Sequence, residues 1–177
     1  AVKKAWGLSD DEEVNWVVGV VNSPAQEVQS VLGQLQNLET RSPGPRAYLL
    51  IVNTPNECVI GGDGDAVKKL VAELGCQYHG IPDVISTHCD VVQPVAQAYR
   101  NLHVFETHVP ERVSFYSGVR AGFYEVTPES AADAILGPAV DGFDFTKVIN
   151  AAYEDGVRVF LEIGPGASCS RMIRQIL

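Results

Sequence analysis

Up to about residue 81, hydrophobic residues occur either in short β-branched runs, which predict strands, or at 3.6-residue spacing, which predicts helices. Residues 14–21 form a short β-branched run that ends at an asparagine, which predicts a buried strand. Ser-Pro-Ala-Gln at residues 23–26 is a capping box with a proline in the first turn, so we expect a helix to begin there. Its apolar residues recur at 3.6-residue spacing until Ser-Pro-Gly-Pro at residues 42–45, which forbids continuation.

Two more strands and a second helix follow. Apolar runs at residues 48–52 and 57–60 flank an Asn-Thr-Pro-Asn turn signal, which predicts a hairpin. Behind a candidate cap at Asp65, valines and leucines at helical spacing predict a helix, and residues 76–81 predict a fourth strand. The order across residues 14–81 is therefore β-α-β-β-α-β, which is typical of a ferredoxin-like fold.

Beyond residue 85 the pattern changes to strands and helices of an α/β layer, which indicates a parallel sheet. The expected elements are a helix over residues 91–102, a strand over 113–117, a helix after Thr127 and Pro128, a helix over 145–153, a strand over 157–163 and a helix after Gly166. Two strands are too few for a sheet covered on both faces. We therefore expect residues outside this chain to supply part of that sheet.

Composition and charge narrow the class of protein. With 46% hydrophobic and 20% charged residues, the 177-residue chain has the composition of a soluble globular protein, and its apolar runs are far shorter than the ~20 residues of a membrane-spanning helix. The formal net charge of −9 argues against nucleic acid as a partner. The four cysteines show no C-x-x-C spacing and no signal peptide is evident, so we expect reduced thiols and a cytoplasmic protein without a membrane partner.

The strongest candidate for chemistry is His88. It follows Ser86 and Thr87 in the connection between a predicted strand and a predicted helix, where α/β folds place catalytic groups. The pattern alone leaves two interpretations open, a general base or a capping, hydrogen-bonded histidine, and the second is commoner. The other three histidines have no ligand spacing with the cysteines, so no metal site is predicted.

Three motifs in register support the first interpretation. Residues 52–62, residues 86–89 and residues 157–166 follow, in order and spacing, the pattern of the malonyl-CoA:acyl-carrier-protein acyltransferases, which the chain resembles. The tail at residues 164–173 is most similar to the acyltransferases of polyunsaturated fatty acid synthases and iterative polyketide synthases. Gly164-Pro165-Gly166 also suggests a phosphate-binding turn, but without the rest of such a motif we interpret it as a tight strand-to-helix turn.

The resemblance implies an α/β fold in which a ferredoxin-like subdomain is inserted into an α/β-hydrolase-like core. The β-α-β-β-α-β order derived from the pattern matches that insert. On this basis residues 1–13 lead in from an upstream core, residues 14–85 form the ferredoxin-like subdomain, and residues 86–177 form the carboxyl-terminal part of the acyltransferase core.

The resemblance also implies a reaction. In the family, a serine in a G-x-S-x-G sequence attacks the thioester of malonyl-CoA, a histidine takes the serine's proton, and the acyl group passes to the phosphopantetheine thiol of an acyl carrier protein. His88 takes that histidine's place. No G-x-S-x-G occurs in this chain. We therefore expect the upstream half of the acyltransferase domain to supply the serine, and this chain alone to be inactive.

Further site residues follow from the resemblance. The family's histidine is oriented by a main-chain carbonyl, here expected from Phe143 or Asp144, with an aspartate side chain as the less favoured alternative. Asn53 corresponds to an asparagine near the active-site cleft, although an asparagine after a strand is as often a turn former. Thr87, the residue before the histidine, would line the acyl pocket, with malonyl as the expected group.

The expected partners are malonyl-CoA and an acyl carrier protein. No cofactor is expected, because CoA and phosphopantetheine act as substrate carriers. An acidic carrier protein would need a basic patch, for which Lys68, Lys69, Arg171 and Arg174 are candidates, although each alone fits a solvated surface charge. The alternative function is a non-catalytic docking or structural module of a multienzyme. The sequence upstream of this chain would distinguish the two.

Overall fold

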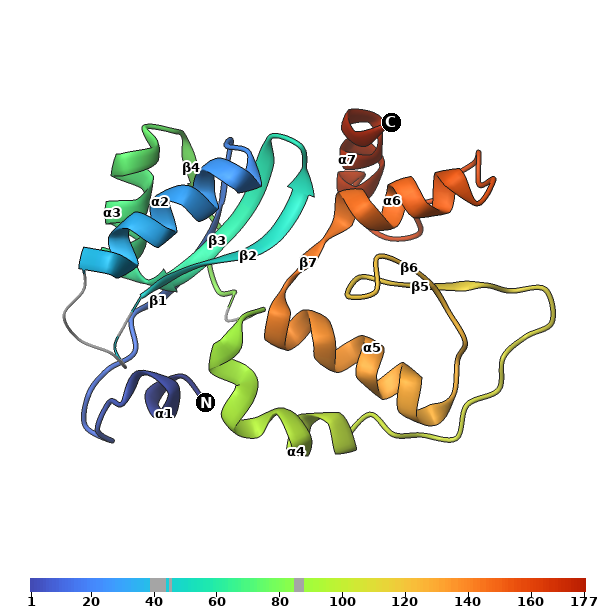
Figure 1. Ribbon diagram of the computed structural model, residues 1–177, viewed down its shortest axis with the longest axis horizontal. Coiled ribbons are helices and arrows are strands. Elements are labelled where there is room, and N and C mark those ends of the chain that lie inside the picture. Colours follow the sequence, from blue (N-terminus) through green and yellow to red (C-terminus); the bar gives the residue numbers. More distant parts are fainter. Residues whose placement is uncertain (39–43, 45, 85–87) are drawn as a thin grey trace.

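The computed structural model describes residues 1–38, 44, 46–84 and 88–177, and within them the chain has a mixed α/β fold. Its main sheet has five strands in the order β4-β1-β3-β2-β7, and β5 and β6 form a separate two-stranded sheet. Helices lie on both sides of the main sheet, and a second group of helices lies beside it (Figure 1).

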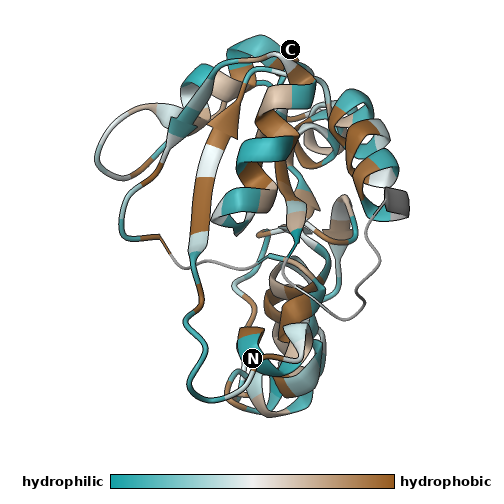
Figure 2. Ribbon diagram, turned by 90° about the vertical axis from the view of Figure 1, so that its left-hand side faces the viewer, coloured by the Kyte–Doolittle hydropathy of each residue, from teal (hydrophilic) through white to brown (hydrophobic). Residues whose placement is uncertain are grey.

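The first unit has the predicted β-α-β-β-α-β order, which confirms the ferredoxin-like fold. Its elements are β1 (Trp16–Val21), α2 (Ala25–Leu38), β2 (Ala47–Thr54), β3 (Glu57–Asp63), α3 (Gly64–Leu74) and β4 (Tyr78–Gly80). β3 pairs antiparallel with both β1 and β2, and β4 pairs antiparallel with β1. α2 and α3 cover one face of this sheet, over a core that includes Val28, Ile60 and Leu70. Figure 2 shows the strands as largely hydrophobic and the covering helices as mixed in hydropathy.

The cap of α3 differs from the prediction. Asp63, and not Asp65, is the N-cap, because its side chain accepts hydrogen bonds from the backbone N–H groups of Asp65 and Ala66. β3 continues through Gly61 and Gly62 directly into the helix, so no separate turn precedes it. Glycine is required at residue 62, where φ is 135° and a Cβ would lie 2.1 Å from the Arg46 carbonyl oxygen.

The opposite face of the sheet is covered by α1 (Val2–Trp6) and by a 3₁₀ helix, η1 (Asp90–Val95). Trp6 is 1% exposed, and its Nε1 donates to the Tyr48 hydroxyl at 2.7 Å. Val91 of η1 is fully buried in the same core as Trp6. This second core fixes the position of the chain immediately after His88.

The remaining elements form the second unit. They are α4 (Ala96–Asn101), β5 (Phe115–Ser117), β6 (Gly122–Tyr124), α5 (Pro128–Asp141), β7 (Phe143–Asp144), α6 (Phe145–Glu154) and α7 (Ser168–Ile176). The helix predicted over residues 91–102 is divided into η1 and α4, because Pro94 has no N–H to donate to an α-helical ladder. β7 pairs in parallel with β2 and so joins the two units in one sheet.

The strand predicted over residues 157–163 does not form. These residues belong to no strand among the described elements, and alternate apolar side chains along them face solvent: Val159 is 74% exposed, Leu161 85% and Ile163 96%. The pattern of the sequence is that of a strand, but no neighbouring strand within the described residues pairs with it.

No helix in the described part of the chain is both long and apolar enough to cross a membrane.

Candidate active site

His88 lies directly before η1, at the edge of the second core. Its φ is 35°, in the left-handed region that few non-glycine residues occupy. Cys89 follows in an extended conformation as the N-cap of η1, and Val91 and Val92 are buried behind it. The buried start of η1 therefore holds His88 in a backbone conformation that is unfavourable by itself, which is a recurrent feature of functional sites.

The imidazole of His88 is oriented by the carboxyl end of α5. Nδ1 lies 2.8 Å from the carbonyl oxygen of Pro138. A carbonyl oxygen only accepts, so Nδ1 must be the donor and must carry a hydrogen. In the neutral imidazole, Nε2 therefore has the free lone pair, which is the arrangement a general base needs.

The position of this carbonyl corrects the expectation that Phe143 or Asp144 would supply it. Pro138 is among the last four residues of α5, whose carbonyls have no intrahelical partner. Phe143 and Asp144 instead form β7 and pair with Ile51 and Val52. The sequence indicated the correct region, but the position at which α5 ends, Asp141, could not be predicted from the sequence.

Phe143 and Asp144 have other roles beside the site. The Phe143 ring meets the His88 ring edge-on, with centroids 6.0 Å apart and an interplanar angle of 73°. Asp144 caps α6, because its Oδ1 accepts from the Thr146 N–H at 3.0 Å. Its side chain thus caps the amino end of α6. No hydrogen bond or ion pair between Asp144 and His88 occurs in the described part of the chain.

Gly142 brings three segments together at this point. Its φ is 68°, and a Cβ here would lie 2.2 Å from the Leu50 carbonyl oxygen and 3.2 Å from the His88 carbonyl oxygen. Only glycine permits this approach between β2, the His88 segment and the end of α5. The backbone of His88 is therefore packed close to β2, and its side chain is held by Pro138.

Asn53, the predicted substrate-binding residue, lies near the end of β2 and belongs to a polar cluster. Its Nδ2 donates to Oε1 of Glu57 at 3.0 Å. The Glu57 carboxylate also receives two hydrogen bonds from the Arg171 guanidinium, at 2.8 and 2.9 Å. The Arg171 hydrogen bonds are the main cause that lowers the pKa of Glu57, with Asn53 contributing. Sequence reasoning missed this pair, because 114 residues separate its members.

Two sequence candidates do not add to the site. Thr87 lies outside the described residues. The four residues of the candidate basic patch do not gather in one place, because Lys68 and Lys69 belong to α3 while Arg171 and Arg174 belong to α7, on the other side of the β2–β3 hairpin (Figure 1).

A groove of about 570 Å³ adjoins the site between α2, β2, β7 and the turn that connects β5 with β6. Gln26 and Gln29 line it from α2, and Lys147 and Phe143 line it from the opposite unit. Phe143 therefore contacts the groove as well as the ring of His88.

The neighbouring thiol is unsuited to act as a nucleophile. Burial raises the pKa of the Cys89 thiol to about 12, so it remains protonated at neutral pH. Among the described residues, no three His, Cys, Asp or Glu side chains come close enough together to hold a metal ion. The chemistry that the site itself offers is proton transfer by His88.

Comparisons with known proteins place this geometry in a known fold. The chain is 24% identical to one subunit of the polyunsaturated fatty acid synthase of a Thraustochytrium species, in a match that covers all of this chain and 9% of that protein. It is 26% identical to 6-methylsalicylic acid synthase of Penicillium patulum, covering 89% of this chain and 9% of that one. The solved malonyl CoA-acyl carrier protein transacylase from Coxiella burnetii has a TM-score of 0.77 at 18% identity, covering 98% of this chain and 54% of that chain.

These matches confirm the resemblance derived from the three motifs. No protein-family model matches the chain. The chain spans about a tenth of the curated relatives it matches and about half of the solved transacylase.

Proposed function

We propose, from a fold shared with malonyl-CoA:acyl-carrier-protein transacylases, that this chain supplies the general base of an acyltransferase that moves malonyl groups from CoA to an acyl carrier protein. The observation that carries the proposal is the hydrogen bond from Nδ1 of His88 to the Pro138 carbonyl, which leaves Nε2 free to accept a proton. The setting is polyketide or polyunsaturated fatty acid synthesis, as the names of the matched synthases suggest.

The proposed mechanism divides the work between two parts of a longer protein. A serine from residues upstream of this chain attacks the thioester carbonyl of malonyl-CoA while Nε2 of His88 takes the hydroxyl proton. The protonated His88 then gives its proton to the departing CoA thiolate. In the second half, Nε2 takes the proton of the carrier's phosphopantetheine thiol, and the sulfur attacks the acyl-serine. The serine oxygen leaves and recovers that proton from His88.

The Pro138 carbonyl stabilises the His88 imidazolium that forms in each half-reaction. When Nε2 is protonated, the imidazolium still donates from Nδ1 to this carbonyl, and a hydrogen bond from a charged donor is stronger than one from a neutral donor. The contact thus helps most when His88 carries the proton. No carboxylate is needed for this role, in contrast to the serine protease triad.

The unpaired apolar segment supports a second part of the proposal. Val159, Leu161 and Ile163 alternate like a strand yet face solvent, so we propose that strands of the upstream half cover them and complete the parallel sheet. Malonyl-CoA and the carrier protein would then reach His88 between the two parts.

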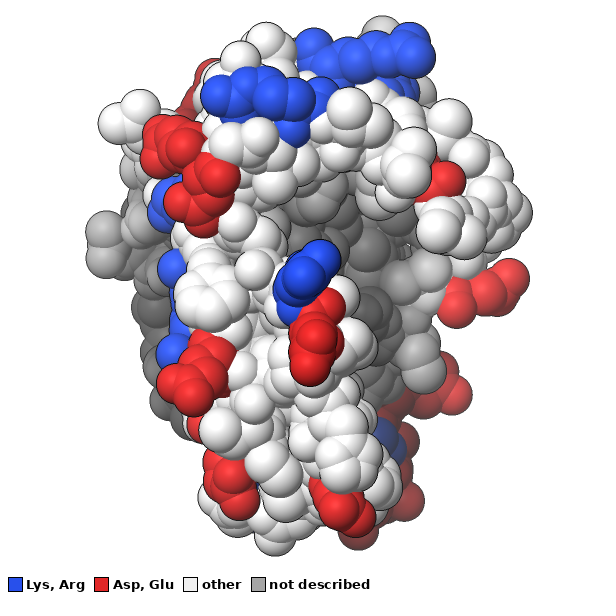
Figure 3. All heavy atoms as spheres, turned by 90° about the vertical axis from the view of Figure 1, so that its right-hand side faces the viewer, with Lys and Arg blue, Asp and Glu red and all other residues white. Residues whose placement is uncertain are grey.

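Cations near α6 and α7 offer a surface for an acidic carrier. Residues 145–177 contain Lys147, Arg158, Arg171 and Arg174. On the face turned to the viewer in Figure 3, Lys and Arg side chains gather along the upper edge, the side on which α6 and α7 lie in Figure 1. These residues also include Glu154, Asp155 and Glu162, so their formal charge is +1, four cations less three carboxylates, against −9 for the whole chain. This makes the surface the more favourable approach for a negative partner.

The test replaces His88 in the longer protein that contains the serine. His88→Ala should lower malonyl transfer by ~10²–10⁴-fold, because the serine then loses its base, while the melting temperature stays close to that of the parent. The measurement is transfer of radiolabelled malonyl from CoA to a carrier protein. The 177-residue chain alone should give no more than background.

His103 provides a matched control. Its Nδ1 also lies 2.8 Å from a main-chain carbonyl, that of Tyr99, and its ring also contacts an aromatic ring. This contact joins His103 to Tyr99, four residues earlier at the end of α4, and involves neither Pro138 nor Phe143, so His103→Ala should leave transfer at the parent rate. If His88→Ala retained full transfer with an unchanged melting temperature, the chain would be a docking or structural module instead.

A further inference from the structure

The ion pair between Glu57 and Arg171 has a geometry unlike the other ion pairs in the described residues. Nη1 and Nη2 of Arg171 donate in parallel to Oε2 and Oε1 of Glu57. The Glu57 side chain is only 13% exposed, and that of Arg171 is 49% exposed. A two-bond fork on a shielded carboxylate holds its partners in one orientation, whereas single contacts between exposed charges contribute little.

This pair anchors α7, which has few other attachments. None of the residues of α7 is buried. Its first turn is held by Glu162, whose carboxylate accepts from the backbone N–H groups of Cys169 and Ser170 at 3.0 and 2.8 Å. Arg171, in the same turn, is the residue that connects the helix to the β2–β3 hairpin. These polar contacts at its amino end therefore help to place α7 against β2, beside its contacts with α6.

The pair also determines which way the amide of Asn53 points. The Glu57 carboxylate only accepts hydrogen bonds, so the NH₂ group of Asn53 must be the group that faces it. The carbonyl oxygen Oδ1 is therefore directed away from Glu57. With Arg171 holding the carboxylate, Asn53 presents a hydrogen-bond acceptor and not a donor.

Asn53 lies on the strand that pairs with the segment beside the candidate base. Ile51 pairs with Phe143, whose ring touches that of His88. Asn53 follows two residues further along β2, which corresponds to about 7 Å of strand. A group held by Oδ1 would thus lie several bonds from the atom that reacts beside His88, and not at that atom itself.

We propose that Arg171 and Glu57 are positioning residues, which orient Asn53 so that its Oδ1 accepts a hydrogen bond from an amide N–H of the pantetheine arm. This inference rests on the proposed function. The thioester carbonyl and the malonyl carboxylate only accept, so neither can pair with Oδ1. The amide groups of the pantetheine arm are the nearest donors to the thioester in both CoA and a loaded carrier protein.

The first experiment tests the orientation without any activity measurement. In the 177-residue chain, the side-chain NH₂ signal of Asn53 is followed by NMR, and exchange of the α7 amides is followed by mass spectrometry. Arg171→Gln and Glu57→Gln should each shift the Asn53 signal and raise α7 exchange by about tenfold. The double variant should exceed neither single variant, because the two residues act as one contact.

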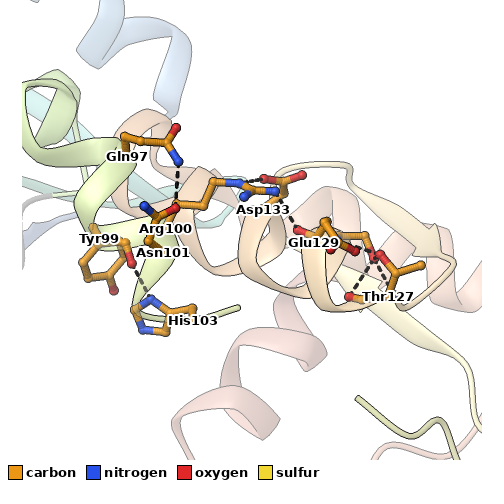
Figure 4. Close-up of polar contacts among 9 residues, drawn as sticks. Gln97, Tyr99, Arg100, Asn101, His103, Thr127, Glu129 and Asp133 are labelled. Carbon is orange, nitrogen blue, oxygen red and sulfur yellow. Dashed lines mark hydrogen bonds and ion pairs between the residues drawn. The ribbon is translucent and has the colours of Figure 1, made fainter. Parts of the chain in front are cut away.

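Arg100 and Asp133 provide the matched control pair. Arg100 of α4 donates to Asp133 of α5 and also to the Glu129 carbonyl oxygen, so it too joins two elements by an arginine–carboxylate contact (Figure 4). Arg100→Gln should leave the Asn53 signal and the exchange of α7 unchanged. An unchanged Asn53 signal in Arg171→Gln would overturn the proposal, whatever the reaction of the longer protein.

The second experiment uses the longer protein and two thioesters. Asn53→Ala and Arg171→Gln should each raise KM for malonyl-CoA by about tenfold at unchanged kcat, the loss of one bond that is equal in ground and transition states. Neither should change transfer from the S-methyl thioester of malonate, which has no amide. Equal losses with both thioesters, or no loss with either, would overturn the pantetheine contact. Absence of transfer by the parent protein itself would instead refute the proposed function.

Discussion

At the scale of single residues, the candidate site depends on the hydrogen bond between His88 and Pro138, the close approach at Gly142 and the ion pair between Glu57 and Arg171. His88 was predicted as the candidate base, because its place after a strand and the motifs around it are visible in the sequence. Pro138 could not be predicted, because every residue has a main-chain carbonyl and the position at which α5 ends was not known from the sequence. The Glu57–Arg171 pair was equally hidden, since only the folded chain brings its members together.

Gly142 yields a stability prediction at this scale. Gly142→Ala places a Cβ 2.2 Å from the Leu50 carbonyl oxygen, in a backbone conformation that only glycine adopts easily. We expect the free energy of unfolding to fall by about 1–3 kcal/mol or more, from backbone strain and the displaced β2 contact. Urea denaturation of the 177-residue chain measures it.

Gly33 is the matched control for that substitution. It lies within α2, and a Cβ there would meet no atom within 4 Å. Alanine favours a helix interior over glycine, so Gly33→Ala should raise the free energy of unfolding by about 0.5–1 kcal/mol. If both substitutions had the same sign, close packing around Gly142 would not be the determinant.

At the scale of elements, the strands of the first unit and the helices of both units were predictable, and the strand expected over residues 157–163 is the main exception. Strands β1 to β3 are apolar runs bounded by turn residues, and they pair with each other in antiparallel register. Residues 157–163 have an equally clear strand pattern, yet a strand needs a neighbour, and sequence periodicity carries no information about whether one is present. β6, with only Gly122 to Tyr124, is too short to give a periodic signal.

The two carboxylates that anchor α7 predict how this element responds to acid. Hydrogen bonds from Arg171 lower the pKa of Glu57, and hydrogen bonds from Ser170 and Cys169 lower the pKa of Glu162. A folded-state pKa below the ordinary value of 4.5 means that each group stabilises the folded state fully above about pH 4.5. That stabilisation is lost as the pH falls through the lowered values.

We therefore expect α7 to lose protection before the rest of the fold on acidification. Hydrogen exchange between pH 6 and pH 3, corrected for the intrinsic rate, should show α7 opening while β1 and β3 stay protected. Glu162→Gln should weaken the α7 amino end already at pH 6 and reduce its pH dependence. Simultaneous opening of α7 and β3 would show that these carboxylates do not control the helix separately.

At the scale of the whole molecule, the exposed apolar segment at residues 157–163 is the surface on which we propose that upstream strands pack. The described residues have two buried cores, both centred on the main sheet. Neither core includes residues 157–163. Natural proteins seldom leave large apolar side chains in alternation on a free strand edge, because such an edge pairs with other chains.

Leu161 allows this relation to be tested with one substitution. In the 177-residue chain, its side chain is 85% exposed, so Leu161→Asp should change the free energy of unfolding by no more than about 0.5 kcal/mol. In the longer protein the same residue would lie in a covered parallel sheet, and a buried unpaired carboxylate should destabilise it severely. Chemical denaturation of both proteins, with Leu161→Asn as a neutral companion, measures the difference.

If the isolated chain were destabilised as strongly, and sedimented as a dimer before the substitution but not after it, a second copy of the chain would be covering this segment. If neither protein changed, no strand would cover it, and the proposed completion of the sheet by upstream residues would be wrong.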